Sequence, residues 1–263
     1  LILRANIGTG FRAPYGFSED LHLCSGSPRV WKSSNLKGER AISYNLSADY
    51  YSKQYQFSIN LFRTNLKDKI QFSPADDEVK KFGYSYQWEN VDDAYVQGVE
   101  LGAKASIARN LTAGVNWTFN QGKFKHERAE WSDPNDESVK EFPQRLKYAK
   151  ESRYISRFPG MTGDFDIDYT PGTWTFSLTS SLQGSMYIDY NSEDAGQNSK
   201  IKKTSTFMLF NCRASKRLGM CTIYAGAKNI FSYIQDEKHT DDAAFMYAPV
   251  YGATWYVGLS VKL

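Results

Sequence analysis

Two short stretches carry residue types that a water-activating hydrolase uses. His239 and Asp241 form an acid–histidine pair with one residue between them, and Asp166 and Asp168 form a carboxylate pair at the same spacing. Such groups could move protons during bond cleavage if both surrounded one water molecule. The two pairs could therefore take part in catalysis only if the elements that carry them bring the pairs together.

The three histidines are also possible metal ligands, including haem iron ligands. All three fall in predicted long loops, and none has a partner at the spacing typical of metal sites: His22, His126 and His239. Metal centres in proteins need several such ligands on one site. The sequence therefore predicts no metal centre and no cofactor.

The elements that must position these residues are predicted to be strands with one apolar face. The stretch 255–263 reads WYVGLSVKL, and its apolar positions alternate with polar, small or amphipathic ones: Trp255, Val257, Leu259, Val261 and Leu263. Successive side chains of a strand point to opposite faces. The same alternation recurs in about ten segments, at 1–10, 39–51, 54–64, 94–107, 111–120, 163–169, 174–183, 206–215, 220–231 and 255–263.

The connections between these segments alternate between short and long. Minimal turns are predicted at 52–53, 109–110, 170–173 and 217–218, whereas the connections at 11–38, 66–93, 121–161, 184–204 and 232–250 are long. Outer-membrane barrels have short periplasmic turns and longer extracellular loops. A tilted strand needs about 9–11 residues to span the hydrocarbon layer. We therefore predict an all-β fold, an antiparallel transmembrane β-barrel segment of about ten strands.

Aromatic residues crowd next to the short turns. They are Tyr50, Tyr51 and Tyr55 at one turn, and Tyr169 and Trp174 at another. Amphipathic rings prefer the membrane interface, which predicts a periplasmic aromatic girdle. The alternative is the general preference of aromatic residues for strands.

Composition agrees with this fold class. The 263 residues are 41% hydrophobic and 15% aromatic, the net charge is +3, and the mean hydropathy is −0.55. No apolar run approaches 18 residues, so no transmembrane helix is predicted. A low mean hydropathy is still compatible with a barrel, because apolar and polar residues alternate along each strand and their hydropathies cancel. The small net charge gives no reason to propose a nucleic-acid partner. Three cysteines are too few for a disulfide scaffold, and we interpret Cys212 and Cys221 as small hydrophobes and Cys24 as a loop residue without an obvious partner.

Five short motifs occur in a fixed order along the chain: GTGFRAP at 8–14, SSNLKGER at 33–40, QGVELGAK at 97–104, AGAKNIF at 225–231 and the closing TWYVGLSVKL. Together they resemble the C-terminal half of the barrel of a TonB-dependent outer-membrane receptor. The second motif has Ser34 and Gly38 where that family often has proline. The chain ends in Leu263, where the family's assembly signal most often ends in phenylalanine, which bears on recognition by the barrel-assembly machinery.

The resemblance implies the remaining architecture. The family's barrel has 22 strands and a plugged lumen, and an N-terminal plug carries the short box that TonB pulls on. The chain opens at Leu1 inside an alternating pattern without an initiator Met or signal peptide. We therefore interpret residues 1–263 as the C-terminal portion of such a barrel, without the plug and box. Isolated, it would have two open edges and would not transport by itself.

The implied function is active uptake of a scarce nutrient across the outer membrane of a Gram-negative bacterium. The implied partners are TonB through the missing plug, the barrel-assembly machinery, outer-membrane lipid and lipopolysaccharide, and an iron-chelate or corrinoid ligand. A ferric siderophore is the first expectation, with cobalamin or haem as alternatives. The candidate ligand-binding residues are mainly loop aromatics that could stack on a flat ligand: Tyr15, Phe17, His22, Trp31, Tyr86, Trp88, Trp131, Tyr187 and Tyr190.

Charged residues allow functional and ordinary interpretations. The predicted lumen face carries Asp164, Asp166, Asp168, Glu100 and Lys104, which either contact a plug or ligand or belong to an ordinary hydrated interior. A basic cluster in the longest loop either receives an anionic ligand or lipopolysaccharide phosphate or forms a solvated face. It comprises Arg145, Lys147, Lys150, Arg153 and Arg157.

Two further functions remain open alternatives, both for a self-contained ten-stranded barrel. As a membrane protease, it would need His239 and Asp241 to meet Asp166 and Asp168, but the first pair is predicted at a loop tip and the second deep in the lumen near a periplasmic turn. As an adhesin, it would share every feature of composition with a receptor. Only the ordered motifs separate the receptor from the adhesin.

Overall fold

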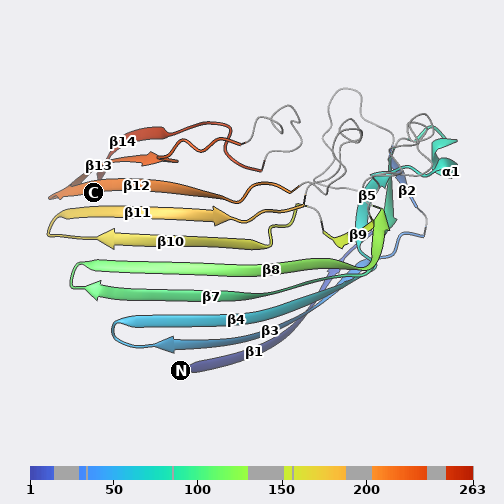
Figure 1. Cartoon of the computed structure of the whole chain (residues 1–263), viewed down its shortest axis with the longest axis horizontal. Helices are drawn as coiled ribbons and strands as arrows, with labels where there is room; N and C mark the ends of the chain where they lie inside the picture. Colours follow the sequence, from blue (N-terminus) through green and yellow to red (C-terminus); the bar gives the residue numbers. More distant parts are fainter. Residues whose placement is uncertain are drawn as a thin grey trace.

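The computed structural model describes residues 1–14, 30–33, 35–84, 86–129, 151–155, 157–187, 203–235 and 247–262. Over these residues the chain forms one large curved sheet and one small sheet, with a single helix of four residues (Figure 1). Within the described residues, no helix is long and apolar enough to cross a membrane.

The large sheet contains eleven antiparallel strands. Ten of them follow one another in sequence order, and the short β9 (Glu151–Tyr154) pairs with the far end of β8. The path runs through β1 (Ile2–Arg12), β3 (Glu39–Tyr51), β4 (Tyr55–Lys67), β7 (Ala94–Ala108), β8 (Leu111–Ala129), β10 (Met161–Tyr169), β11 (Trp174–Gln183), β12 (Phe207–Leu218), β13 (Cys221–Lys228) and β14 (Thr254–Val261). All ten predicted strands are confirmed within this path. The antiparallel barrel-type sheet is therefore confirmed as well.

The largest difference from the prediction is the length of β8. The sequence predicts a strand over 111–120, but β8 continues to Ala129 and carries His126, which was expected in a long loop. The extension pairs with β9, a strand that the sequence pattern does not indicate. The strand continues beyond the apolar layer into water, and there Lys123 and Lys125, beside the polar His126, take the positions at which the alternating pattern would need apolar residues.

The short turns gather at one end of the large sheet, on the left in Figure 1. The turn predicted at 217–218 lies two residues later, at Gly219 and Met220, because Leu218 still pairs with Cys221. Gly219 has a φ of 61° and Gly172, in another short turn, has a φ of 63°. Only glycine adopts this left-handed conformation without steric cost, so the glycines fix where these turns fall.

A small sheet lies at the opposite end, on the right in Figure 1. It contains β2 (Val30–Lys32), β6 (Tyr86–Asn90) and β5 (Ile70–Pro74) in that order, with α1 (Asp77–Lys80) between β5 and β6. The strand β6 pairs with β2 and β5 and not with the strands of the large sheet, although it lies in a connection that was predicted as a long loop. The side chain of Asn90 donates to the carbonyl oxygens of Lys37 and Asp68 at 3.0 and 2.7 Å, which ties the small sheet to the end of β4.

Residues paired across the large sheet share a face, and the pairing separates apolar from polar rows. One row runs Ala48, Ile59, Leu101 and Trp117, and we call the face that carries it the apolar face. The neighbouring row, on what we call the polar face, runs Ser47, Asn60, Glu100 and Thr118. The predicted division of these strands into an apolar and a polar face is therefore confirmed.

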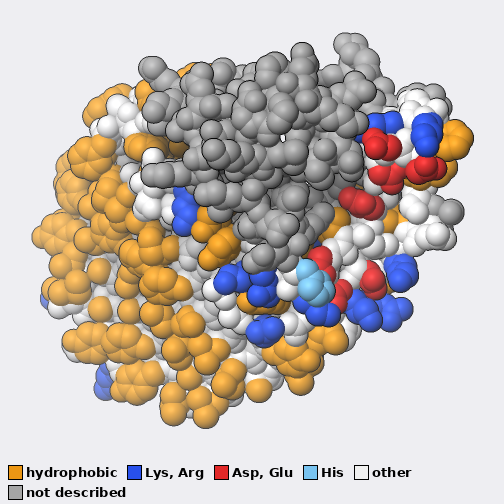
Figure 2. Space-filling model, turned by 45° about the vertical axis from the view of Figure 1, so that its right-hand side comes forward, with side chains coloured by type: hydrophobic (Ala, Val, Ile, Leu, Met, Phe, Trp, Pro, Cys, Tyr) orange, Lys and Arg blue, Asp and Glu red, His pale blue; other side chains and the backbone are white. Residues whose placement is uncertain are grey.

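The apolar face is exposed rather than packed on a core. Ile7 is 72% exposed, Leu46 55% and Val257 79%. Figure 2 shows hydrophobic side chains covering a broad continuous area of the molecule. An exposed apolar area of this size in a sheet that alternates strictly is typical of a wall in contact with lipid.

Aromatic rings stack beside the short turns on the apolar face. The centroids of Tyr50 and Phe57 are 6.4 Å apart, and those of Trp174 and Phe176 are 5.6 Å apart. The ammonium group of Lys216 lies 4.9 Å from the centroid of Trp174. Amphipathic aromatic rings are expected at the membrane interface, where the hydrocarbon layer meets the lipid headgroups.

Candidate functional site

The polar face is held by hydrogen bonds between neighbouring strands. Asn60 Nδ2 donates to Glu100 Oε2 at 2.9 Å, and Asn116 Nδ2 donates to Asp164 Oδ2 at 2.9 Å. The hydroxyl of Ser177 donates to Asp168 Oδ1 at 2.5 Å. The predicted acidic residues thus lie on the polar face, and two of the three aspartates of β10 accept hydrogen bonds from neutral side chains.

A hollow of about 280 Å³ opens on the polar face toward the short turns. Its lining includes Asp49, Lys104 and Asp166. Gly114 also lines it, and a Cβ built there would approach Asp166 Oδ1 to 2.5 Å, so glycine leaves room for the carboxylate. Asp49 forms an ion pair with Arg4 of β1. The hollow therefore offers charges of both signs to whatever covers this face.

The opposite end of the polar face carries an aromatic cluster that the sequence did not indicate. The ring of Phe207 stacks on Tyr233, with centroids 5.0 Å apart and planes within 8°, and it lies 6.3 Å from the ring of Tyr247. Gln235 is 1% exposed, and its Oε1 accepts from the N–H groups of Tyr247 and Ala248 at 2.9 and 3.1 Å. We call Phe207, Tyr233 and Tyr247 the Phe207 cluster.

The Phe207 cluster borders a hollow of about 440 Å³. Thr162, Ser181 and Gln183 line it together with Phe207 and Tyr247. Register places Thr162, Gln183 and Phe207 in one row of the polar face. Hydroxyls, an amide and ring faces therefore meet at the loop end of the wall, which suits a ligand with both polar and aromatic parts.

Tyr187, one of the predicted ligand-binding residues, belongs to a second aromatic cluster. Its ring stacks on Tyr154 of β9 with centroids 4.4 Å apart. The ammonium groups of Lys203 and Lys123 lie 4.3 Å from the Tyr187 centroid and 5.0 Å from the Tyr154 centroid, respectively. Sequence reasoning missed Tyr154 and both lysines, because only the pairing of β8 with β9 brings positions 123 and 154 together.

The small sheet holds three predicted aromatics. Trp31 of β2 lies 6.5 Å from the ring of Phe82 and 5.1 Å from that of Tyr84. It pairs with Gln87, so it lies on the face opposite to Trp88 of β6, the strand that also contains Tyr86. Trp88 is only 3% exposed, whereas Trp31 is half-buried and keeps part of its ring open.

His126 pairs with a carboxylate instead of joining a metal site. Its Nδ1 lies 2.9 Å from Asp92 Oδ1, and its backbone N–H donates to Asp92 Oδ2. Burial opposes ionisation of Asp92, but the backbone and side-chain hydrogen bonds from His126 and the N–H of Asp93 outweigh it and lower the pKa of Asp92. Among the described residues, no three His, Cys, Asp or Glu side chains are grouped so as to hold a metal ion.

Other predicted residues are placed as follows. Trp255, Val257, Leu259 and Val261 lie on β14 and are between 50% and 79% exposed. Cys212 and Cys221 are free and half-buried in apolar rows, opposite Leu178 and Val261. Arg153 Nε donates to the carbonyl oxygen of Phe124 at 3.0 Å, and Arg157 is exposed.

Several predicted residues lie outside the described residues: Tyr15, Phe17, His22, Cys24, Trp131, Arg145, Lys147, Lys150, Tyr190, His239, Asp241 and Leu263.

Comparison with known proteins agrees with this geometry. Residues 1–230 match the family described as TonB dependent receptor-like, beta-barrel. The chain is 26% identical over 192 residues to the vitamin B12 transporter BtuB of Photobacterium profundum, a match that covers 72% of this chain and 26% of that protein. It is 29% identical over 136 residues to the ferric enterobactin receptor of Pseudomonas aeruginosa, covering 45% and 18%. The chain thus spans about a quarter or less of the length of these relatives.

Solved structures show the same fold. The copper transporter OprC superposes with a TM-score of 0.64 at 20% identity, over 98% of this chain and 37% of that one. The siderophore receptor PirA from Pseudomonas aeruginosa superposes with a TM-score of 0.63 at 16% identity, over 98% and 39%.

The family match covers most of the chain, and these relatives are transport receptors rather than enzymes. Receptors of this kind are outer-membrane β-barrel proteins of Gram-negative bacteria, which agrees with the exposed apolar face. The chain therefore belongs to the TonB-dependent receptors, and its large sheet corresponds to part of their outer-membrane β-barrel.

Proposed function

We propose that the chain is the C-terminal portion of the barrel of a receptor for TonB-dependent active uptake of a scarce nutrient, and that this nutrient is a ferric siderophore. The observation that carries the proposal is the division of the wall into an exposed apolar face and a hydrogen-bonded polar face. Such a wall suits a lipid-embedded passage with a polar lumen.

The polar face has room for a plug at one end and a ligand at the other. The hollow around Asp49, Lys104 and Asp166 lies toward the short turns, where the N-terminal plug of the whole receptor would form ion pairs and hydrogen bonds. The Phe207 cluster and its hollow lie toward the long connections. A ligand caught outside would meet this second hollow before the first.

The chemistry of the loop end favours an anionic ligand with flat rings. The Phe207 cluster offers ring faces beside hydroxyl and amide groups, and Tyr187 and Tyr154 stack under Lys203 and Lys123. Rings stack on rings, and ammonium groups stabilise anionic oxygens. A ferric catecholate combines both features, and several structural neighbours are named as iron or siderophore receptors.

Cobalamin is the second candidate, because the transporter BtuB shares 26% identity over 72% of this chain. A corrinoid also offers a flat ring, but cobalamin carries only one phosphodiester anion and therefore offers less negative charge to Lys123 and Lys203 than a ferric catecholate does. Haem, the other alternative, combines a flat ring with carboxylates, and it is included in the experiment for that reason.

The test is uptake by cells that make the receptor as its gene encodes it. A strain that lacks its own receptors would be given iron-55 enterobactin, iron-55 haemin or cobalt-57 cyanocobalamin, with and without a functional TonB. We expect TonB-dependent accumulation of iron from the siderophore. Accumulation of cobalamin or haemin instead would replace the proposed ligand, and the absence of TonB-dependent uptake of all three would contradict the proposed function.

A further inference from the structure

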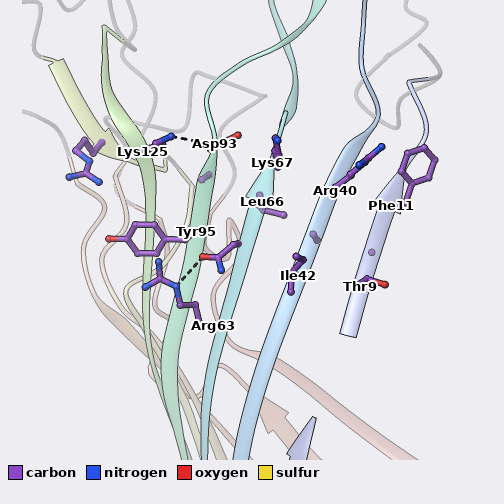
Figure 3. A pocket seen from close by; sticks show the side chains of 15 residues that line it. Thr9, Phe11, Arg40, Ile42, Arg63, Leu66, Lys67, Asp93, Tyr95 and Lys125 are labelled. Carbon is purple, nitrogen blue, oxygen red and sulfur yellow. Dashed lines mark hydrogen bonds and ion pairs between the residues drawn. The ribbon is translucent and has the colours of Figure 1, made fainter. Parts of the chain in front are cut away.

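Two hollows lie at the loop end of the large sheet, on opposite faces. The larger, of about 770 Å³, spans β1, β3, β4 and β7 (Figure 3) and is lined by Ile42 and Arg63 among others. These two residues lie an even number of positions from Ala48 and Ile59 on their strands, and so on the apolar face. The hollow of about 440 Å³ beside the Phe207 cluster, which we call the Phe207 hollow, lies on the polar face. A ligand in the lumen therefore meets only the Phe207 hollow.

One wall of the Phe207 hollow comes from a loop. The connection from β13 to β14 covers residues 229–253, of which the structure describes 229–235 and 247–253. Tyr247, Ala248 and Pro249 line the hollow from this connection. These three residues belong to none of the described strands, so their backbone depends on other hydrogen bonds for its position.

Gln235 supplies those hydrogen bonds. Its Oε1 accepts from the N–H groups of Tyr247 and Ala248 at 2.9 and 3.1 Å. Its own backbone N–H donates to the carbonyl oxygen of Pro249 at 2.8 Å. Gln235 is 1% exposed and does not itself line the hollow. All three loop residues of the wall are therefore bound to one buried residue behind it.

Asn229 holds Tyr233 in a similar way. Its Oδ1 accepts from the N–H of Tyr233 at 2.9 Å, and its Nδ2 donates to the carbonyl oxygens of Tyr233 and Tyr251 at 2.7 and 3.2 Å. Its backbone N–H donates to Asn211 Oδ1 of β12 at 3.0 Å. Asn229 is 8% exposed and has a φ of 50°, a left-handed conformation that asparagine adopts more readily than most residues.

The two residues thereby fix the backbone from which two rings project. The ring of Tyr233 stacks on Phe207 with centroids 5.0 Å apart, and the ring of Tyr247 lies 6.3 Å from Phe207. A wall that is already in place spares a ligand the cost of ordering the loop. If the wall had its binding shape for only part of the time, the apparent affinity would fall by that fraction.

We propose that Asn229 and Gln235 are positioning residues for ligand recognition, which keep the loop wall of the Phe207 hollow in its binding shape before a ligand arrives. Both side chains are buried and act through the residues that they hold, Tyr233 and Tyr247. This inference rests on the proposed function for its ligand. It goes beyond that function by assigning the residues that set the affinity.

The first test needs no ligand. Gln235→Met removes the amide at the loop wall, and Gln97→Met is the matched control, because Gln97 binds Arg63 on the apolar face of β7. Both variants of the whole receptor are first checked for the heat-modifiable band of a folded barrel. A 4-fluorophenylalanine in place of Tyr247 then reports the contact with Phe207 through its fluorine resonance.

We expect the fluorine resonance to move and broaden in Gln235→Met and to stay at the wild-type position in Gln97→Met. Asn229→Gly is the second variant, because glycine keeps the left-handed backbone but lacks the amide. It should move the resonance of a label at Tyr233 in the same way. An unchanged resonance in both loop variants would overturn the proposal, whatever the ligand is.

The second test measures binding of ferric enterobactin to the same proteins by quenching of tryptophan fluorescence. We expect Kd to rise roughly tenfold in Gln235→Met and in Asn229→Gly, because the hollow would have its binding shape for about a tenth of the time. Gln97→Met should stay within about twofold of the wild type. A loop variant that moves the fluorine resonance but binds as the wild type does would show that the wall plays no part in recognition.

A double variant separates positioning from a general loss of structure. In a receptor that carries Phe207→Leu, the rings held by the loop have lost their partner, so adding Gln235→Met should change Kd by less than about twofold. A full tenfold effect in that background would mean that Gln235 acts elsewhere and would overturn the proposal. If the wild type binds no ferric enterobactin, haemin or cyanocobalamin, the proposed function fails, and the fluorine resonances still decide whether the two residues position the wall.

Discussion

At the scale of single residues, Tyr187 and Tyr154 form a stacked pair at the loop end of the wall, and one lysine lies over each ring. Tyr187 was predicted as a ligand residue, whereas Tyr154, Lys123 and Lys203 join it only through strand pairing and a bridge. Ring contacts in such a cluster depend on stacking more than on the phenol hydroxyl. This allows the ring and the hydroxyl to be tested separately.

Replacing Tyr187 with Ala removes the ring that stacks on Tyr154. If the ligand contacts this cluster, the loss of one aromatic contact is about 0.5–1.5 kcal/mol, or roughly a two- to twelvefold rise in Kd. Quenching of tryptophan fluorescence by ferric enterobactin measures the Kd of the intact receptor. Tyr187→Phe keeps the ring and should bind as the wild type does. Equal Kd values for the Ala and Phe variants would exclude stacking by Tyr187.

The pair between Asp92 and His126 gives a prediction about pH. Because the pKa of Asp92 is lowered in the folded protein, its contribution to stability is present above its unfolded pKa of about 3.9 and is lost as pH falls through the lower folded value. The contribution is at most about 1 kcal/mol, because the His126 side chain is 69% exposed.

The carboxyl carbon-13 shift of Asp92 measures this pKa in detergent-solubilised receptor. We expect a midpoint below about 3.9, and a higher midpoint in His126→Ala, which keeps the backbone N–H but loses the ring contact. A wild-type midpoint at or above about 3.9 would show that the hydrogen bonds do not outweigh burial.

At the scale of strands, the two faces of the wall follow from the sequence period. The predicted rows of apolar residues are the rows that the register aligns, since side-chain direction alternates by residue and needs no knowledge of distant partners. The extension of β8, the strand β9 and the small sheet could not be predicted in this way. Polar strands that pair in water lack the apolar period, and their partners lie far away in sequence.

The assigned faces can be tested by arginine substitution. Leu46→Arg places a charge on the apolar face and should cost roughly 2–4 kcal/mol at the bilayer midplane, blocking assembly, whereas Ser47→Arg faces the lumen and should be tolerated. Val115→Arg and Asn116→Arg repeat the comparison on β8, where the second change would lie beside Asp164. Heat-modifiable protein in the outer membrane is the readout. Similar yields on both faces would refute the orientation.

Strand packing at Gly98 gives another prediction. A Cβ at this position would overlap the carbonyl oxygen of Phe119 and lie 2.7 Å from the Phe62 ring, so Gly98→Ala should destabilise the barrel by roughly 1–3 kcal/mol. Gly8 also faces the polar side, and a Cβ there meets nothing within 4 Å. The midpoint of urea unfolding should therefore fall for Gly98→Ala and stay nearly unchanged for Gly8→Ala. Equal shifts would contradict the close packing at Gly98.

At the scale of the whole molecule, β1 and β14 form the two edges of the described large sheet. Open edges leave backbone N–H and C=O groups without partners, which a lipid environment does not tolerate. Further strands that close the barrel would satisfy both edges, in agreement with relatives of which this chain covers about a quarter or less. The ligand site could not be predicted fully from the sequence, because clusters such as Phe207 with Tyr233 and Tyr247 arise from loop packing rather than from a period.

The size of the native gene product tests the central claim most directly. Outer membranes of the source cells would be probed with an antibody to this segment, and boiled samples compared with unboiled ones. We expect a heat-modifiable band well over twice the 30.0 kDa of this chain. A larger receptor with a plug would contain this wall as one part, so its band must be that much heavier. A heat-modifiable band near 30.0 kDa would mean a self-contained ten-stranded barrel and would contradict the account.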